Sequence, residues 1–186
     1  MPTVNLLSFP NDIVQEGIHF CIPASVLSVL KYYDQNIKCT QFGLMQLLIS
    51  NSKSNSPSLE SVIEAIKPQL ENDYNFQYLG PSTFDEWKDN VITNLTKSYP
   101  MIFTSRNNSG PHVRVIIGFD ELTNTFIIFD PGESGSLDKI LNHTGNIIGS
   151  IWTIKSMIKT YTEIEAKEDW NKPNRCSDQL LISPKN

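Results

Sequence analysis

The hydrophobic pattern of this 186-residue chain changes at Pro100, and this change constrains the fold more than any other feature. Before Pro100, apolar residues recur at the three- and four-residue spacing of amphipathic helices. After it come short apolar runs, rich in β-branched and aromatic residues and separated by turn residues: MIFTS, HVRVIIGF, TFIIFD and IIGSIWTI. Helices followed by an antiparallel sheet are typical of an α+β domain, so we predict that fold class.

Four helices are predicted in the first half of the chain. Residues 22–33, IPASVLSVLKYY, repeat apolar side chains at helical spacing and predict a central, largely buried helix. A second helix is expected over 40–49, a third from Ser58, and a fourth from Ser82 or Thr83. The fourth has large apolar residues on one face: Phe84, Trp87, Val91 and Leu95.

The remaining segments are shorter or more polar. Residues 76–79 are expected to form a short strand, and residues near 155–161 a final helix. Residues 1–14 are interpreted as an N-terminal arm, and residues 166–186 as a polar tail that wraps the surface or stays disordered. Because the chain has no repeat, low-complexity segment or linker, residues 1–186 are expected to form one domain.

Cys21 stands at the start of the first predicted helix, just before Pro23 in its first turn. A helix N-terminus presents unpaired backbone N–H groups and the positive end of the helix dipole, and both stabilise a thiolate. The thiolate is the nucleophilic form of cysteine, so this position suits catalysis. The alternative is that Cys21 is a small buried apolar side chain.

His112 opens one predicted strand and Asp130 closes the next. Side chains alternate along a strand, so His112, Arg114 and Ile116 share a face, while the residues between them form the core face. With a hairpin loop at 120–124, antiparallel pairing places His112 opposite Asp130 or one step diagonal from it. A carboxylate there can hold an imidazole in one tautomer. Alternatively, the histidine ends a strand and the aspartate begins a turn.

Gln15 precedes Cys21 by six residues, in an expected loop. Its side-chain amide, together with the backbone N–H of Cys21, could donate hydrogen bonds to the oxyanion of an acyl-transfer reaction. A solvated loop glutamine is the alternative, so this hypothesis depends on the other three residues.

Other polar candidates receive structural interpretations. His19 has no orienting carboxylate near it in the chain and is expected to line the entrance to the site. His143, in LNHTGN, is interpreted as a turn residue, and Asp120 lies at the wrong end of the hairpin to orient His112. Arg114 is expected to be solvated or ion-paired rather than to bind a substrate carboxylate.

Composition excludes several classes of function. The formal net charge is −5 and no basic run occurs, which argues against a protein that binds nucleic acid through phosphate neutralisation. The Cys, His and carboxylate spacings match no zinc site, and there is no glycine-rich phosphate loop, so no metal and no cofactor are expected.

No apolar run reaches the length of a membrane span, and residues 1–17 lack the pattern of a secretory signal. We therefore expect a protein that is cytoplasmic or exported without a Sec-type signal. Three cysteines exclude a complete disulfide framework, although Cys39 and Cys176 could pair in an oxidising compartment.

Two segments resemble the papain-like cysteine peptidases, in particular the bacteriocin-processing branch that removes double-glycine leaders, and its free-standing relatives. They are QEGIHFCIPASVLSVLKYY, from Gln15 to Tyr33, and HVRVIIGFDELTNTFIIFDP, from His112 to Pro131. In that branch a glutamine precedes the cysteine, and the base opens a valine-rich strand whose hairpin leads to an Asp-Pro pair. Ile22 is a departure, because a glycine commonly follows the cysteine.

The resemblance implies a papain-like α+β fold and hydrolysis of a peptide or protein substrate. Cys21 would be the nucleophile, His112 the base, Asp130 the orienter and Gln15 the oxyanion donor. The same residues would also support deamidation or acyl transfer, as in a toxin or effector. A member of the fold that only binds peptides is a further alternative.

Overall fold

The computed structural model describes residues 4–6, 8–10, 12–17, 19–51, 58–107, 110–132, 136–141, 147–153, 158–172 and 178–185, with the main chain alone at 106, 107, 110, 136–141 and 147–153. The helices are α1 (Cys21–Tyr33), α2 (Gln41–Asn51), α3 (Leu59–Ala65), α4 (Lys67–Leu70), α5 (Phe84–Leu95) and α6 (Glu163–Trp170). The strands are β1 (Val4–Asn5), β2 (Tyr74–Leu79), β3 (Met101–Asn107), β4 (Gly110–Asp120), β5 (Thr125–Phe129), β6 (Ser136–Leu141), β7 (Ile147–Thr153), β8 (Ile158–Thr162) and β9 (Gln179–Pro184).

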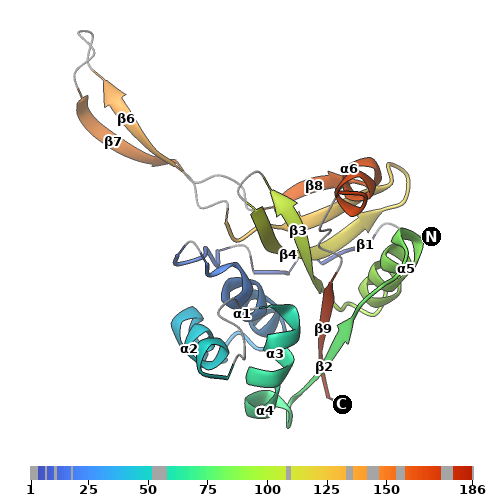
Figure 1. Cartoon of the computed structure of the whole chain (residues 1–186). Coiled ribbons are helices and arrows are strands. Elements are labelled where there is room, and N and C mark those ends of the chain that lie inside the picture. The colour runs from blue at the N-terminus through green and yellow to red at the C-terminus, as the bar shows by residue number, and fades with distance from the viewer. Residues whose placement is uncertain are drawn as a thin grey trace.

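The described strands form two antiparallel sheets (Figure 1). The larger has seven strands in the order β2-β9-β3-β4-β5-β8, and β1 also pairs with β4. The smaller consists of β6 and β7, which Figure 1 shows extending away from the larger sheet. The predicted α+β class is confirmed, with most helices before Pro100 and most strands after it.

Helices α2, α3 and α5 begin close to the predicted positions because their caps are encoded locally. The Thr40 hydroxyl accepts a hydrogen bond from the Gly43 N–H at the start of α2. Ser58 caps α3 through a reciprocal pair of bonds with Ser61, and Thr83 caps α5. The predicted apolar face of α5 is buried: Phe84, Trp87, Val91 and Leu95.

The predicted final helix near 155–161 is wrong in its placement. Ile158–Thr162 is strand β8, paired along its length with β5, and helix α6 starts only at Glu163. The boundary is set by Thr162, whose side chain and that of Glu165 form a capping box. Within β8, Tyr161 packs into the core, so tertiary burial favours the strand.

The predicted polar tail at 166–186 is also wrong. Residues up to Trp170 complete α6, and Gln179–Pro184 form β9, which lies between β2 and β3 in the sheet. Leu180 and Ile182 are fully buried. The apolar run of β9 is only a few residues long, and the polar sequence before it concealed a strand that belongs to the core.

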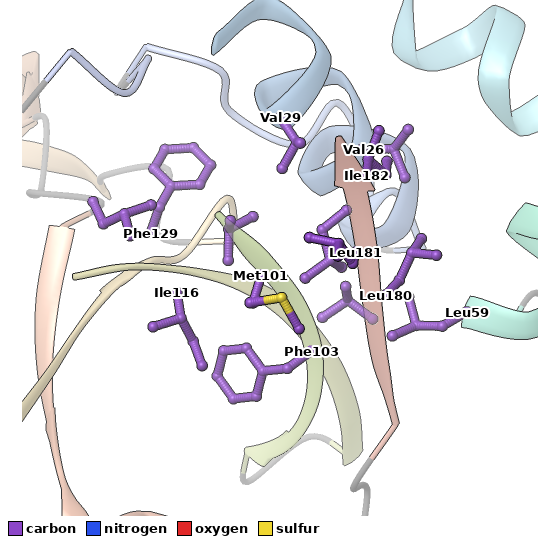
Figure 2. Close-up of a cluster of buried hydrophobic side chains, with 14 of the residues drawn as sticks. Val26, Val29, Leu59, Met101, Phe103, Ile116, Phe129, Leu180, Leu181 and Ile182 are labelled. Carbon is purple, nitrogen blue, oxygen red and sulfur yellow. The ribbon is translucent and has the colours of Figure 1, made fainter. Parts of the chain in front are cut away.

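Helices cover both faces of the large sheet, so the predicted division into a core face and a site face is incomplete. Val26 and Val29 of α1 lie over one face, near Phe129 and Ile182 (Figure 2). On the opposite face Phe103, which pairs with Arg114 of β4, packs its ring against Trp87 of α5. The face that carries His112 is therefore closed by α5, and His112 lies at the beginning of β4.

Candidate active site

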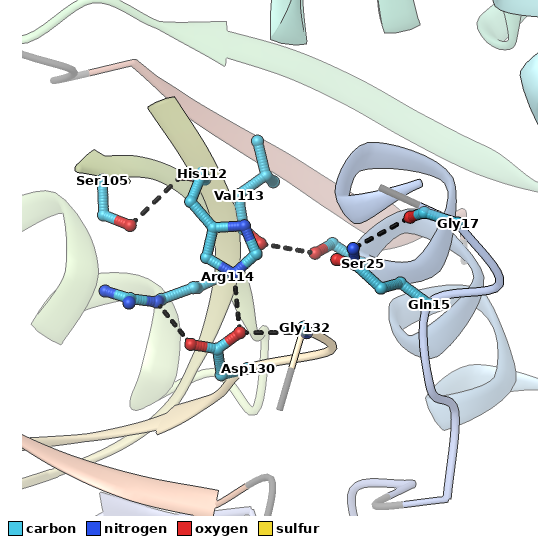
Figure 3. A network of polar contacts seen from close by, with 9 residues as sticks. All are labelled: Gln15, Gly17, Ser25, Ser105, His112, Val113, Arg114, Asp130 and Gly132. Carbon is cyan, nitrogen blue, oxygen red and sulfur yellow. Dashed lines mark hydrogen bonds and ion pairs between the residues drawn. The ribbon is translucent and has the colours of Figure 1, made fainter. Parts of the chain in front are cut away.

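Cys21 is the first residue of α1, at the end of the helix where backbone N–H groups lack helical partners. Helix α1 packs on β4, and the Ser25 hydroxyl donates to the Val113 carbonyl over 3.4 Å, one residue after His112 (Figure 3). This contact fixes the first turn of α1 against the start of β4. Cys21 is half-buried and Ser25 fully buried.

His112 and Asp130 form the closest polar pair of the site. The His112 Nε2 atom lies 2.6 Å from Asp130 Oδ1, and both residues are buried (Figure 3). Strands β4 and β5 pair Val115 with Phe129, and the same register continued by one residue places Asp130 beside Arg114, diagonal to His112. The predicted proximity of His112 and Asp130 is therefore present in the structure.

The Asp130 carboxylate accepts hydrogen bonds on both oxygens. Oδ1 accepts from His112 and from the Gly132 N–H, the latter over 3.0 Å. Oδ2 accepts from Arg114 Nε over 2.8 Å, and the Arg114 side chain is 13% exposed. The ion-paired interpretation of Arg114 is confirmed, and its partner is the carboxylate of the candidate site.

The protonation equilibria of the three groups favour a thiolate–imidazolium pair. Burial raises the pKa of the Cys21 thiol, but hydrogen bonds from His112 and Val113 and the charge on His112 outweigh it, so the pKa is lowered. Burial lowers the pKa of His112, but its bonds and charge interactions with Asp130 and Cys21 outweigh burial and raise this pKa to about 9. Both shifts favour an anionic sulfur beside a cationic ring over the neutral pair.

Asp130 remains ionised for the same reason. Burial raises the pKa of its carboxyl, but the hydrogen bond and charge of His112, with the charge of Arg114, lower it to about 2. A buried carboxylate with cations on both sides can hold the His112 ring with its Nε2 toward Asp130 and its other ring nitrogen available to Cys21.

Gln15 lies beside the loop that follows Asp130. Its backbone N–H donates to the Pro131 carbonyl over 2.9 Å. Figure 3 shows its side-chain Nε2 donating to the Gly17 carbonyl, over 2.9 Å. A Cβ placed on Gly132 would lie 3.2 Å from Gln15 Oε1 and 3.1 Å from His112 Nε2. The structure thus brings Gln15, His112 and Asp130 around one glycine.

Gly132 is a residue of the site that our sequence analysis missed. A Cβ there would also lie 3.0 Å from His112 Cε1, closer than side chains normally approach. The sequence signal was the glycine two residues after Asp130, but a glycine after Asp-Pro reads equally well as an ordinary turn.

The other candidates are an exposed histidine, a turn aspartate and residues that include two outside the described part of the chain. His19 is exposed. Asp120 accepts from the Leu122 N–H and the Thr123 hydroxyl in the β4–β5 turn, at the far end of the hairpin from His112. Cys39 is a free thiol, whereas its suggested partner Cys176 and the turn residue His143 are outside the described residues.

Within the described part of the chain, no cluster of three or more His, Cys, Asp or Glu side chains could hold a metal ion. Among the same residues, no helix combines the length and apolar character needed to cross a membrane.

The sequence profile of the Peptidase_C39 like family matches residues 6–167, which include Gln15, Cys21, His112 and Asp130. The chain belongs to this family. The expected papain-like resemblance is therefore confirmed at the level of the family. No curated protein matches this Peptidase_C39 like chain in sequence.

A similar solved structure is the crystal structure of the peptidase domain of Streptococcus ComA, a bifunctional ABC transporter involved in a quorum-sensing pathway. The superposition has a TM-score of 0.59 at 14% sequence identity, and covers 93% of this chain and 97% of the ComA domain. At this identity the likeness concerns the fold, and it confirms the predicted papain-like α+β architecture for this Peptidase_C39 like protein.

Proposed function

We propose that this protein is a cysteine peptidase that hydrolyses peptide bonds with Cys21 as nucleophile, His112 as base and Asp130 as orienter. One observation carries the proposal: a half-buried cysteine at a helix N-terminus, with lowered thiol pKa, interacts with a histidine whose Nε2 lies 2.6 Å from a buried aspartate. Membership of the Peptidase_C39 like family supports a peptide or protein substrate.

In the first step the Cys21 thiolate attacks the carbonyl carbon of a substrate amide, and the carbonyl oxygen becomes an oxyanion. The Gln15 side-chain amide and the Cys21 backbone N–H donate hydrogen bonds to this oxyanion.

In the second step the imidazolium of His112 gives its proton to the leaving amine as the C–N bond breaks, which leaves an acyl group on Cys21. Neutral His112 then takes a proton from water, whose oxygen attacks the thioester. Collapse of that adduct releases the acid and the thiolate, with the proton again on His112. Asp130 stays ionised throughout and stabilises each cationic state of the ring.

The proposal is tested by a peptide-library cleavage screen with the wild type and Cys21→Ala side by side. We expect cleavage by the wild type only, because alanine supplies no nucleophile and suits the first turn of α1. A library that neither protein cleaves, or that both cleave equally, would contradict the proposal.

A thiol probe separates a peptidase from a protein that only binds peptides. Iodoacetamide should alkylate Cys21 rapidly at neutral pH in the wild type and slowly in His112→Ala, because the lowered thiol pKa depends on His112. Cys39, whose thiol pKa is raised by burial, serves as the internal reference. Equal, slow alkylation of Cys21 in both proteins would favour a binding role.

A further inference from the structure

Gln41 is a buried polar side chain that the proposed mechanism does not use. It is the first residue of α2 and only 3% exposed. Its Nε2 donates to the Val14 carbonyl over 2.6 Å, and its Oε1 accepts from the Glu16 N–H over 3.0 Å. One amide thus binds the two main-chain groups on either side of Gln15.

The segment that Gln41 holds is neither helix nor strand, so its main-chain groups find partners elsewhere in the protein. Gln41 supplies partners for Val14 and Glu16, and the Pro131 carbonyl accepts from the Gln15 N–H over 2.9 Å. Residues 14–16 are therefore hydrogen-bonded on one side to α2 and on the other to the loop after Asp130.

Helix α2 is itself placed relative to the nucleophile. It packs against α1, whose first residue is Cys21, and its N-terminus is defined by the Thr40 cap. The two bonds of Gln41 therefore connect the Gln15 main chain to the pair of helices that includes Cys21. An oxyanion donor is effective only when it is held in place before the reaction, since a displacement of about 1 Å can cost about 100-fold in rate.

We propose that Gln41 is a positioning residue that holds the Gln15 amide where it stabilises the oxyanion. The inference rests on the proposed peptidase function. This role requires a hydrogen-bond donor and an acceptor on one short planar group, because the Val14 carbonyl needs a donor and the Glu16 N–H needs an acceptor. Methionine has a similar length but supplies neither group.

The chain offers a matched control in Gln179. This glutamine is fully buried, its Nε2 donates to the Trp87 carbonyl over 3.1 Å, and its Oε1 accepts from Asn90 over 3.3 Å. These contacts join β9 to α5 and do not include the segment at 14–16. Gln179→Met therefore removes a comparable buried amide without touching the Gln15 loop.

The experiment measures peptide hydrolysis by Gln41→Met and Gln179→Met, each with and without Gln15→Ala. With Gln15 present, we expect Gln41→Met to lower kcat about 10- to 100-fold with KM little changed, within the loss of about 100- to 1000-fold that follows removal of an oxyanion donor. In the Gln15→Ala background the same change should lower kcat less than about twofold, since it acts through Gln15. Gln179→Met should change kcat similarly and slightly in both backgrounds.

Alkylation of Cys21 by iodoacetamide needs the thiolate but no oxyanion donor, so Gln41→Met should keep the wild-type rate and pH dependence. An equal loss of kcat with and without Gln15, or a parallel loss of alkylation, would overturn the inference.

If the wild type hydrolyses no peptide, the proposed function fails, and amide hydrogen exchange still tests whether Gln41 positions the segment around Gln15. Protection of the Glu16 N–H against exchange should fall in Gln41→Met and not in Gln179→Met. Unchanged protection in Gln41→Met would refute the positioning role of Gln41.

If Gln41→Met does not fold, Gln41→Glu serves as the second variant. It keeps the acceptor for Glu16 and, when ionised, loses the donor to Val14, so it should lower kcat in the same Gln15-dependent way. Wild-type kcat in Gln41→Glu would contradict the inference.

Discussion

Replacing Asp130 with asparagine tests the proposed orienter without changing the size of the side chain. Asp130 accepts from His112 and Gly132 on one oxygen and from Arg114 on the other. An asparagine offers one oxygen and one NH2 group. Whichever way its amide is turned, the NH2 faces a donor, either Arg114 Nε or the Gly132 N–H and the His112 ring.

The effect on rate follows from the pKa of His112, which rises from 6.5 to about 9. That rise corresponds to about 3 kcal/mol in favour of the imidazolium, and Asp130 shares it with Cys21. If Asp130 contributes about 2 kcal/mol, its loss lowers the equilibrium ratio of the ion pair to the neutral pair about 30-fold. Misorientation of the ring adds to this, so we expect kcat/KM at pH 7 to fall roughly 30- to 300-fold, much less than in Cys21→Ala.

The buried donor that Asp130→Asn leaves facing another donor should lower the free energy of unfolding by about 1 to 3 kcal/mol. Combining it with Arg114→Met removes one of the conflicting donors, so the double variant should lose less stability than the sum of the single variants. Urea unfolding gives the stabilities, and initial rates on the best library peptide give kcat/KM.

The role of Asp130 would be refuted by a loss of kcat/KM as large as that of Cys21→Ala, or by a loss of less than about twofold. Purely additive stabilities in the Arg114→Met and Asp130→Asn pair would refute the donor conflict that we derive from the carboxylate contacts.

Four further predictions concern pH, packing and the core. Activity should fall as pH rises through about 9, where His112 loses its proton. On the acid side, activity should be lost only below the ordinary pKa of a thiol, because the pKa of Cys21 is lowered. A pH–rate profile of kcat/KM checks both limits. His112, with its pKa raised in the folded state, stabilises the fold fully below pH 6.5, and this contribution should be lost through pH 9 in urea titrations. Gly132→Ala should slow hydrolysis while leaving the protein folded, because its Cβ would displace the His112 ring; a wild-type kcat would contradict this. Leu180→Ala should cost about 2 to 5 kcal/mol of unfolding free energy, measured with urea, whereas a surface tail would predict almost no effect.

Much of the helical half could be predicted because its signals are local. The caps at Thr40, Ser58 and Thr83 are side chains that bind backbone within their own first turn, and the apolar spacing of α1 and α5 is read directly along the chain. The pairing of His112 with Asp130 was predicted only in part from local signals. The turn pairs Asp120 with Thr125, and a shift in register between Ile116 and Gly118 then gives the pairing of Val115 with Phe129 that the expected loop at 120–124 also implied.

Strand β9 could not be predicted, because its reason to be a strand lies outside its own sequence. Gln179–Pro184 pairs with β2 on one side and β3 on the other, more than seventy residues earlier in the chain. Its carbonyl at Ile182 also accepts from the Tyr33 hydroxyl of α1. A short apolar run takes its conformation from such partners rather than from local propensity.

The sequence alone determined the division into a helical half and a strand-rich half and identified the candidate residues Gln15, Cys21, His112 and Asp130, because periodicity, caps and residue chemistry are properties of short segments. The tertiary structure decided what surrounds them. It paired Arg114 with Asp130 Oδ2 and placed Gly132 against the His112 ring. It also brought the Gln41 amide to the main-chain groups of Val14 and Glu16, the two neighbours of Gln15. These contacts join segments distant in sequence, and their geometry follows from how the helices and the sheet pack together.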